Sequence, residues 1–180
     1  MNSDLNKGNN SIVADEIYFA GGCFWGTEHF FKLIKGVIST EVGYANGKTT
    51  SPTYREVITD KTGFAETVKV IYDPNQIDLG LLLDLYFQTI DPTSVNRQGN
   101  DIGTQYRSGI FYLSVYQLAF IREALMAIAS RYDRPIAVEV TPLQNFYPAE
   151  EYHQNYLDKN QGGYCHISPK LFEVARQANH

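Results

Sequence analysis

The stretch EIYFAGGCFWGTEHFFKLI, residues 16–34, decides the fold class because the hydrophobic pattern changes within it. Residues 16–20 have the character of a strand, and Gly21-Gly22 interrupts it. Residues 24–34 then follow the spacing of an amphipathic helix. The side chains expected along one side of that helix are Thr27, Phe30, Phe31 and Ile34. A strand followed at once by a helix predicts a fold in which helices pack on a sheet.

Outward from this stretch, short strands and amphipathic helices continue along the chain. Further strands are expected at 37–45, 65–72, 108–114 and 136–140, and helices near 79–90, 115–131 and 149–159. The apolar stripe expected on the 115–131 helix is Val115, Leu118, Ala119, Leu125, Met126 and Ala129. The pattern fits helices packed on a mixed sheet, but it does not choose between an α/β and an α+β arrangement.

The chain has 180 residues, the length of one domain on the usual scale of about 100–200 residues. Residues 1–14 are polar and predict a flexible N-terminal lead. We therefore expect a single domain over 15–180. Its last part, about 160–180, begins near Gly162-Gly163 and predicts a mobile tail.

The charge balance argues against nucleic acid as a partner. Lys and Arg number 15 against 20 Asp and Glu, for a net charge of −5, whereas phosphate binding needs a basic stripe. No apolar run approaches the ~20 residues of a membrane helix, so no membrane partner is expected. The polar start is unlike a signal peptide, so the expected location is the cytoplasm.

The chain contains two cysteines, Cys23 and Cys165. Two thiols cannot form a four-thiolate zinc site, and the four histidines are scattered without ligand spacing near a cysteine, so we expect no metal. In a reducing compartment the cysteines are inert buried thiols, a nucleophile, or a redox couple.

Cys23 is the stronger chemical candidate because it follows two glycines at the expected start of a helix. Unpaired amides and the positive end of the helix dipole favour a thiolate there and lower its pKa. Phe24 and Trp25 beside it would wall a small apolar pocket. The alternative is a buried cysteine surrounded by core aromatics.

Glu66 is the second candidate. In a strand over 65–72 it shares a face with Val68, Val70 and Tyr72, and a carboxylate on an apolar face is an exception. Burial would raise its pKa toward neutrality and suit it to act as a general acid. The alternatives are a salt-bridged edge residue or a strand that faces the other way.

Three further residues lie in loops. Tyr54 follows Pro52-Thr53, and Tyr106 stands where a strand is about to begin. A phenol can donate a hydrogen bond to an oxygen that gains negative charge, although most tyrosines only cover the edge of a core. Asp101 is either a turn residue or a hydrogen-bond anchor for a tyrosine.

Cys165 follows Gly162-Gly163-Tyr164 in the expected tail. A mobile tail would let its sulfur reach a distant partner, as disulfide exchange requires. The alternative is an incidental tail thiol.

Taken together, these segments resemble the peptide methionine sulfoxide reductase A family, which reduces the S epimer of the sulfoxide. The matching stretches are 22–26 (GCFWG), 42–45 (VGYA), 52–54 (PTY), 65–66 (AE), 72–74 (YDP), 98–101 (QGND), 103–108 (GTQYRS), 149–150 (AE), 152–154 (YHQ) and 163–165 (GYC). Each run alone is only moderately specific, whereas their common order from Cys23 to Cys165 is very specific.

The resemblance implies an α+β fold. The form it implies is a two-layer sandwich around a mixed sheet, with a ferredoxin-like core and a long, loop-like C-terminal tail. It also implies that Cys23 attacks the sulfoxide sulfur while Glu66 donates a proton to the oxygen. Tyr54 and Tyr106 would hydrogen-bond that oxygen, and Asp101 would help to order the site.

The resemblance further implies how the substrate is held and how the enzyme is recycled. Phe24 and Trp25 would hold the methyl group of methionine sulfoxide, free or in proteins. Cys165 would condense with the sulfenic acid of Cys23, and thioredoxin would reduce the disulfide, with no bound cofactor. We expect a monomer that repairs proteins after oxidative damage.

One position departs from the family pattern. The residue before the Ala65-Glu66 pair is usually histidine, and here it is Phe64. Two other functions stay open on the residues alone. A cysteine hydrolase or acyl transferase would need a base near Cys23, and His29 lies six residues further on, facing another direction. A binding module with an aromatic groove would leave the two cysteines and Glu66 unexplained.

Overall fold

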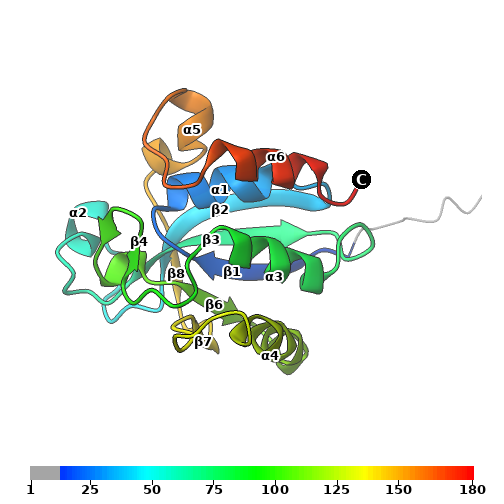
Figure 1. Ribbon diagram of the computed structural model, residues 1–180. Helices are drawn as coiled ribbons and strands as arrows, with labels where there is room; N and C mark the ends of the chain where they lie inside the picture. The colour runs from blue at the N-terminus through cyan, green and yellow to red at the C-terminus, as the bar shows by residue number, and fades with distance from the viewer. Residues whose placement is uncertain (1–12) are drawn as a thin grey trace, which may run out of the picture.

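The structure is a computed structural model that describes residues 13–180 (Figure 1). The long strands are β1 (Asp15–Ala20), β2 (Val37–Ala45), β3 (Ala65–Tyr72), β6 (Gly109–Tyr112), β7 (Glu139–Pro142) and β8 (Phe146–Pro148). The helices are α1 (Phe24–Lys32), α2 (Tyr54–Val57), α3 (Leu79–Gln88), α4 (Val115–Ala129), α5 (Tyr156–Lys159) and α6 (Pro169–Gln177). Short elements complete the list: β4 (Arg97–Gln98), β5 (Asp101–Ile102) and the 3-10 turns η1 (Thr104–Tyr106) and η2 (Glu151–His153).

Six strands form one mixed sheet in the order β7-β6-β1-β3-β2-β8. All neighbours are antiparallel except β6 and β7, which run parallel. The expected mixed sheet with packed helices is therefore confirmed. The expected ferredoxin-like core would consist of strands β6-β1-β3-β2 with α1 and α3 in the connections between them. That assignment stays a prediction.

The sheet is curled rather than flat. Only residues 143–145 separate β7 from β8, although these strands lie at its two opposite edges. Four Cα steps of ~3.8 Å reach at most about 15 Å. Five strand spacings of ~4.8 Å would put the edges of a flat sheet about 24 Å apart. The two edges must therefore approach one another at this end of the sheet.

Small residues line the face of the sheet on which β7 and β8 close. Ala20, Ala45 and Ala65 are fully buried there beside Phe111. A Cβ at Gly43 would lie 2.5 Å from the Tyr147 carbonyl oxygen and from the Phe146 ring. Close approach of the edge strand thus requires a residue without a side chain at position 43.

The opposite face carries the main core, over which the helices pack. Helix α1 contacts β2 and β3, α3 contacts α4, and α6 lies alongside α1 (Figure 1). The predicted side of α1 is confirmed, because its four expected side chains are all buried: Thr27, Phe30, Phe31 and Ile34.

The stripe predicted on α4 is wrong for four of its six residues, because only Leu118 and Leu125 are half-buried. Val115 and Met126 are 74% and 78% exposed, whereas Ile121 and Ile128 are buried. Gln117 is also buried, because its amide donates to the Glu16 carbonyl and accepts from the Leu113 backbone N–H. A buried amide that serves the backbone of its neighbours is invisible to a count of apolar residues.

The C-terminal tail is not loop-like over its full length, which corrects the expectation for about 160–180. Helix α6 begins at Pro169 after the N-cap Ser168, whose hydroxyl accepts from the Lys170 backbone N–H. Ala175 is fully buried against the core, so packing on α1 fixes this helix. The helix expected over 149–159 is likewise interrupted, because Asn155 adopts a left-handed φ of 52° between η2 and α5.

The expectations of a flexible N-terminal lead and of no membrane-spanning helix can be compared with the structure only over residues 13–180. The flexible lead at 1–14 falls almost wholly on residues 1–12, which lie outside that range. Within residues 13–180, no helix is long and apolar enough to cross a membrane.

The curl predicts a specific sensitivity at Gly43. Replacing Gly43 with Ala should lower the free energy of unfolding by about 2–3 kcal/mol, because backbone as well as ring atoms must shift. Gly80→Ala in α3 is the control: its Cβ would meet no backbone atom and only the N-cap oxygen of Asp78, at 3.2 Å, and alanine favours the helix, so any loss of stability should be much smaller than at Gly43. Urea unfolding of both variants measures the difference, and equal stability would contradict the role of Gly43.

Candidate functional site

The bend between β1 and α1 presents Cys23 at the N-cap of α1. Gly22 has a φ of +82°, a conformation that favours glycine. The bend is held on two sides. The Tyr86 hydroxyl donates to the Ala20 carbonyl at 2.6 Å, and the Gly22 backbone N–H donates to the Tyr106 carbonyl at 3.2 Å. The predicted position of Cys23 at the start of a helix is confirmed.

Glu66 lies next to this helix start. The Phe24 backbone N–H, one residue after Cys23, donates to Glu66 Oε1 at 3.2 Å. Glu66 is 2% exposed and shares the face of β3 with Val68 and Val70, so the predicted facing is confirmed. Burial raises the pKa of Glu66 to about 8, the Phe24 N–H lowers it, and the charge of Asp101 raises it. The carboxyl is therefore protonated at neutral pH.

The thiol of Cys23 differs from expectation. Burial, followed by the charge of Glu66, raises its pKa, and the opposing Trp25 backbone N–H is too weak to reverse this. The expectation that the helix N-terminus would lower this pKa is wrong for the free protein. Desolvation of a nearly buried sulfur outweighs the helix amides.

Aromatic side chains wall the site beside Cys23. Phe24 is 1% exposed and packs on His153, with ring centroids 5.2 Å apart. Trp25 donates from Nε1 to His153 Nδ1 at 3.0 Å and stacks on Tyr156 at 3.6 Å. The orientation of the indole is thus fixed from two sides.

Tyr54 and Tyr106 both lie close enough to Glu66 and Cys23 for a negative charge on either group to raise the pKa of the phenols. Burial first, and Glu66 second, raise the pKa of Tyr54 to about 12 and also raise that of Tyr106. Both phenols therefore keep their protons near neutral pH and can act as donors.

The carboxylate of Glu150 positions the backbone of Tyr54. Glu150 accepts from its backbone N–H at 3.0 Å and from the Tyr44 hydroxyl at 2.9 Å, which joins α2 to β2. The Tyr54 ring lies 4.6 Å from that of His153.

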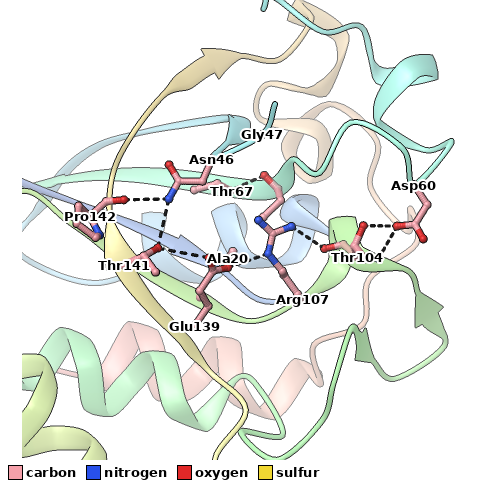
Figure 2. A network of polar contacts seen from close by, with 12 residues as sticks. Ala20, Asn46, Gly47, Asp60, Thr67, Thr104, Arg107, Glu139, Thr141 and Pro142 are labelled. Carbon is pink, nitrogen blue, oxygen red and sulfur yellow. Dashed lines mark hydrogen bonds and ion pairs between the residues drawn. The ribbon is translucent and has the colours of Figure 1, made fainter. Parts of the chain in front are cut away.

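A separate polar network holds the segment of Tyr106 (Figure 2). Arg107 donates to Glu139 Oε2 at 2.8 Å and to the Thr104 carbonyl at 3.0 Å. Thr104 in turn donates from its backbone N–H to Asp60 at 2.8 Å and also from its hydroxyl. Asp60 follows α2, so one network connects the segments that carry the two tyrosines.

Asp101 stands at the start of β5 with its Oδ2 buried and without a hydrogen-bond partner within residues 13–180. Its charge raises the pKa of Glu66, of both cysteine thiols and of His166. Asp101 is therefore the acidic group that the whole cluster shares.

Cys165 reaches the same helix as Cys23. A Cβ at Gly26, one turn after Cys23, would lie 2.9 Å from Cys165 Sγ. Within the described part of the chain both cysteines are free thiols. Burial raises the pKa of Cys165, so it too is protonated at neutral pH. The structure thus brings together every residue singled out from the sequence.

Sequence reasoning missed four residues of the site: Glu150, His153, Tyr156 and His166. Three of them had a signal in the motifs of the resemblance. Glu150 lies in 149–150, His153 lies in 152–154, and His166 directly follows 163–165. Nothing in the sequence pointed to Tyr156, because its stacking on Trp25 depends on the left-handed turn at Asn155. Over residues 13–180, no group of three or more His, Cys, Asp or Glu side chains could hold a metal ion.

Phe64, at the position that departs from the family pattern, is 1% exposed. Its ring meets Tyr147 edge-on at 5.8 Å and closely covers Gly47. It therefore adds apolar surface beside β3, in keeping with the desolvation of Glu66.

Comparison with known proteins identifies the family. Residues 15–180 match the family model described as peptide methionine sulfoxide reductase. The chain belongs to this family. A relative from Lachnoclostridium phytofermentans, named peptide methionine sulfoxide reductase MsrA, is 56% identical over 162 residues, which are 90% of this chain and 98% of the relative.

Solved structures agree. Mxr1 from Saccharomyces cerevisiae in reduced form has a TM-score of 0.82 at 40% identity and covers 86% of this chain and 91% of its own. Mxr1 in complex with Trx2 has a TM-score of 0.57 at 30% identity, covering 79% and 84%. The protein is therefore an oxidoreductase that reduces methionine sulfoxide, and the hydrolase and binding-module alternatives are set aside.

Burial of Glu66 predicts a pH-dependent stability. The unfolded carboxyl ionises near 4.5 and the folded one near 8, so between these values the folded state binds more protons. The free energy of unfolding should therefore fall as pH rises through this window, by up to about 1.4 kcal/mol per pH unit.

Urea unfolding at pH 5 and pH 8 measures this effect. Glu66→Gln should abolish it and gain stability over wild type as pH rises, whereas Glu123→Gln, on the exposed face of α4, should keep the wild-type slope. Parallel pH profiles for wild type and Glu66→Gln would contradict a buried, protonated Glu66.

Proposed function

We propose that the protein reduces methionine S-sulfoxide, free or in proteins, with Cys23 as nucleophile and Glu66 as proton donor. The observation that carries this proposal is the 3.2 Å hydrogen bond from the Phe24 N–H to Glu66, which ties a buried acid to the bend that holds the thiol. A sulfoxide oxygen is a poor leaving group until it is protonated, so acid and nucleophile must act on one substrate.

The proposed chemistry needs no added proton. Cys23 attacks the sulfoxide sulfur while the Glu66 carboxyl protonates its oxygen, and the carboxylate so formed takes the thiol proton. The hydroxyl oxygen then transfers from the substrate sulfur to the Cys23 sulfur as the bond between the two sulfurs breaks. Methionine leaves, and Cys23 becomes a sulfenic acid, the reversible first stage of cysteine oxidation. The pKa of Glu66, about 8, supports this role because the carboxyl is protonated at neutral pH and can donate its proton. Acid and thiol interact and titrate as a pair.

Tyr54 and Tyr106 are proposed to hydrogen-bond the sulfoxide oxygen. Their raised pKa values support this, because un-ionised phenols are donors to developing negative charge. A thioether lacks that oxygen and would leave these donors unpaired. The preference for sulfoxide over methionine therefore comes mainly from these hydrogen bonds.

Phe24 and Trp25 are proposed to hold the methyl group of the substrate. Support comes from the fixed indole, which is stacked on Tyr156 and bonded to His153. An apolar pocket of this kind contributes only about 1–3 kcal/mol of discrimination per methyl group.

The proposed recycling uses Cys165, with Asp101 ordering the site. Cys165 condenses with the sulfenic acid, and thioredoxin reduces the resulting disulfide. The contact of Cys165 Sγ with α1 at Gly26 supports the first step. The complex of the similar Mxr1 with Trx2 supports the second.

The biological setting follows as part of the same proposal. Methionine sulfoxide arises by oxidation, so the reaction repairs proteins after oxidative damage. We further propose one catalytic domain over 15–180, acting as a cytoplasmic monomer.

The two cysteines predict different defects. Cys23→Ser should form no methionine from a methionine S-sulfoxide peptide, because serine cannot accept the oxygen. Cys165→Ser should form about one equivalent and then stop with thioredoxin present, because the sulfenic acid is not resolved. Methionine release measured by chromatography distinguishes them. Full turnover by Cys23→Ser would exclude it as the nucleophile, and full turnover by Cys165→Ser would exclude it as the resolving thiol.

Glu66→Gln predicts a slow reductase step. Glutamine keeps the acceptor for the Phe24 N–H but holds no transferable acid proton, so single-turnover methionine formation should slow by about 10²–10⁴-fold. The exposed control Glu123→Gln should react like wild type. A Glu66→Gln rate equal to wild type would rule out proton donation by this residue.

A further inference from the structure

His166, the residue after Cys165, lies over the bend that carries Cys23. Its Nε2 is 3.0 Å from the Gly21 carbonyl oxygen, and a Cβ at Gly22 would lie 2.8 Å from the same nitrogen. A carbonyl only accepts hydrogen bonds, so Nε2 must carry the proton. In the neutral imidazole the other nitrogen, Nδ1, is then a bare acceptor.

That bare acceptor is buried without a hydrogen-bond partner among residues 13–180. It lies on the same small patch of α1 as the thiol of Cys165: a Cβ at Gly26 would be 3.3 Å from His166 Nδ1 and 2.9 Å from Cys165 Sγ. The absence of a side chain at Gly26 leaves room for both groups. A buried acceptor without a hydrogen bond costs free energy of desolvation, so a hydrogen bond or proton from a neighbouring donor would be favourable.

The charges around the ring suit a proton acceptor. Burial lowers the pKa of His166, which keeps the imidazole neutral at rest, and Asp101 opposes this by favouring the imidazolium. Asp101 Oδ2 is itself buried and unpaired in the described chain. The other titratable groups of this cluster are Cys23, Cys165, Glu66 and the phenols of Tyr54, Tyr106 and Tyr164.

The neighbouring thiol needs such an acceptor. The Cys165 sulfur points toward the Ile167 carbonyl at 3.5 Å, a group that can only accept from it. Because burial raises its pKa, few of these thiols are ionised at neutral pH, whereas the thiolate is the attacking form in disulfide chemistry.

We propose that His166 Nδ1, directly or through one water, accepts the Cys165 proton as the Cys165 sulfur attacks the sulfenic acid of Cys23. An S–S bond forms, the Cys23 S–O bond breaks, and the leaving hydroxide takes the proton from His166 as water. The Cys165 sulfur is oxidised and the Cys23 sulfur is reduced, so no further reactant is needed. This inference rests on the proposed function, because it concerns the second half of that reaction.

The competing explanation is that His166 only anchors the bend through Gly21. Two variants separate the roles. Gln in place of His166 keeps a donor at the position of Nε2 but has no basic nitrogen, whereas Asn cannot reach Gly21. If the residue is an anchor, Gln should restore the rate that Asn loses. If it accepts a proton, both variants should be slow.

The experiment is a single turnover of the full chain with a methionine S-sulfoxide peptide and no thioredoxin. Rapid quench follows methionine formation and, by mass spectrometry, the Cys23–Cys165 disulfide. His166→Gln should form methionine within about twofold of wild type but form the disulfide at least about 10²-fold more slowly at pH 7. The matched control is His29→Asn, a histidine of α1 that faces Asp158 and Phe172. It should leave both steps unchanged.

The pH profile adds a readout that an anchoring role would not move. Wild-type disulfide formation should level off once the imidazole is neutral, whereas the His166→Gln rate should keep rising about tenfold per pH unit as the thiol ionises. A wild-type disulfide rate in His166→Gln, or a lower rate with an unchanged pH profile, overturns the inference. Failure of the wild-type protein to form methionine or the disulfide would instead overturn the proposed function.

Discussion

The hydrogen bond from the Phe24 backbone N–H to Glu66 is the contact on which the rest of the site depends. It joins the first free amide of α1 to a carboxyl in the middle of the sheet. This geometry requires β1 and β3 to be neighbours in register, with Ala20 opposite Thr67, so that the end of one strand meets the start of the other. Because the carboxyl is buried, it keeps its proton at neutral pH. Fold and protonation are therefore set by the same packing.

The curl of the sheet brings the remaining residues to this contact. Without it, three residues could not connect β7 and β8, and the chain could not return from Glu139 at one edge to Glu150 beside β2. Glu139 holds Arg107 beside Tyr106, while Glu150 holds the backbone of Tyr54. The two tyrosines thus come from separate short helical segments, α2 and η1, rather than from the loops expected from the sequence, but both depend on one closing segment.

The sequence predicts most of what local periodicity controls. Alternation along 65–72 placed Glu66 on the apolar face, and helical spacing placed the buried side of α1. The curl was not predictable in this way, because it depends on contacts of Gly43 with a strand about 100 residues later. Helix α6 did have a local signal, the Ser168-Pro169 start, which the glycines before it obscured. The pKa of Cys23 was misjudged because burial depends on which distant segment covers the thiol.

The raised pKa of Cys23 is consistent with the proposed chemistry. A thiolate exposed at rest reacts with many oxidants, whereas a protonated, buried thiol is slow to do so. At rest the two thiols, Glu66 and both tyrosines are all protonated and uncharged. A substrate that takes the proton of Glu66 leaves a carboxylate able to receive the thiol proton. In the proposed mechanism the nucleophile is then formed only when the sulfoxide oxygen is present, so the burial that opposes ionisation would also restrict reaction to the correct ligand.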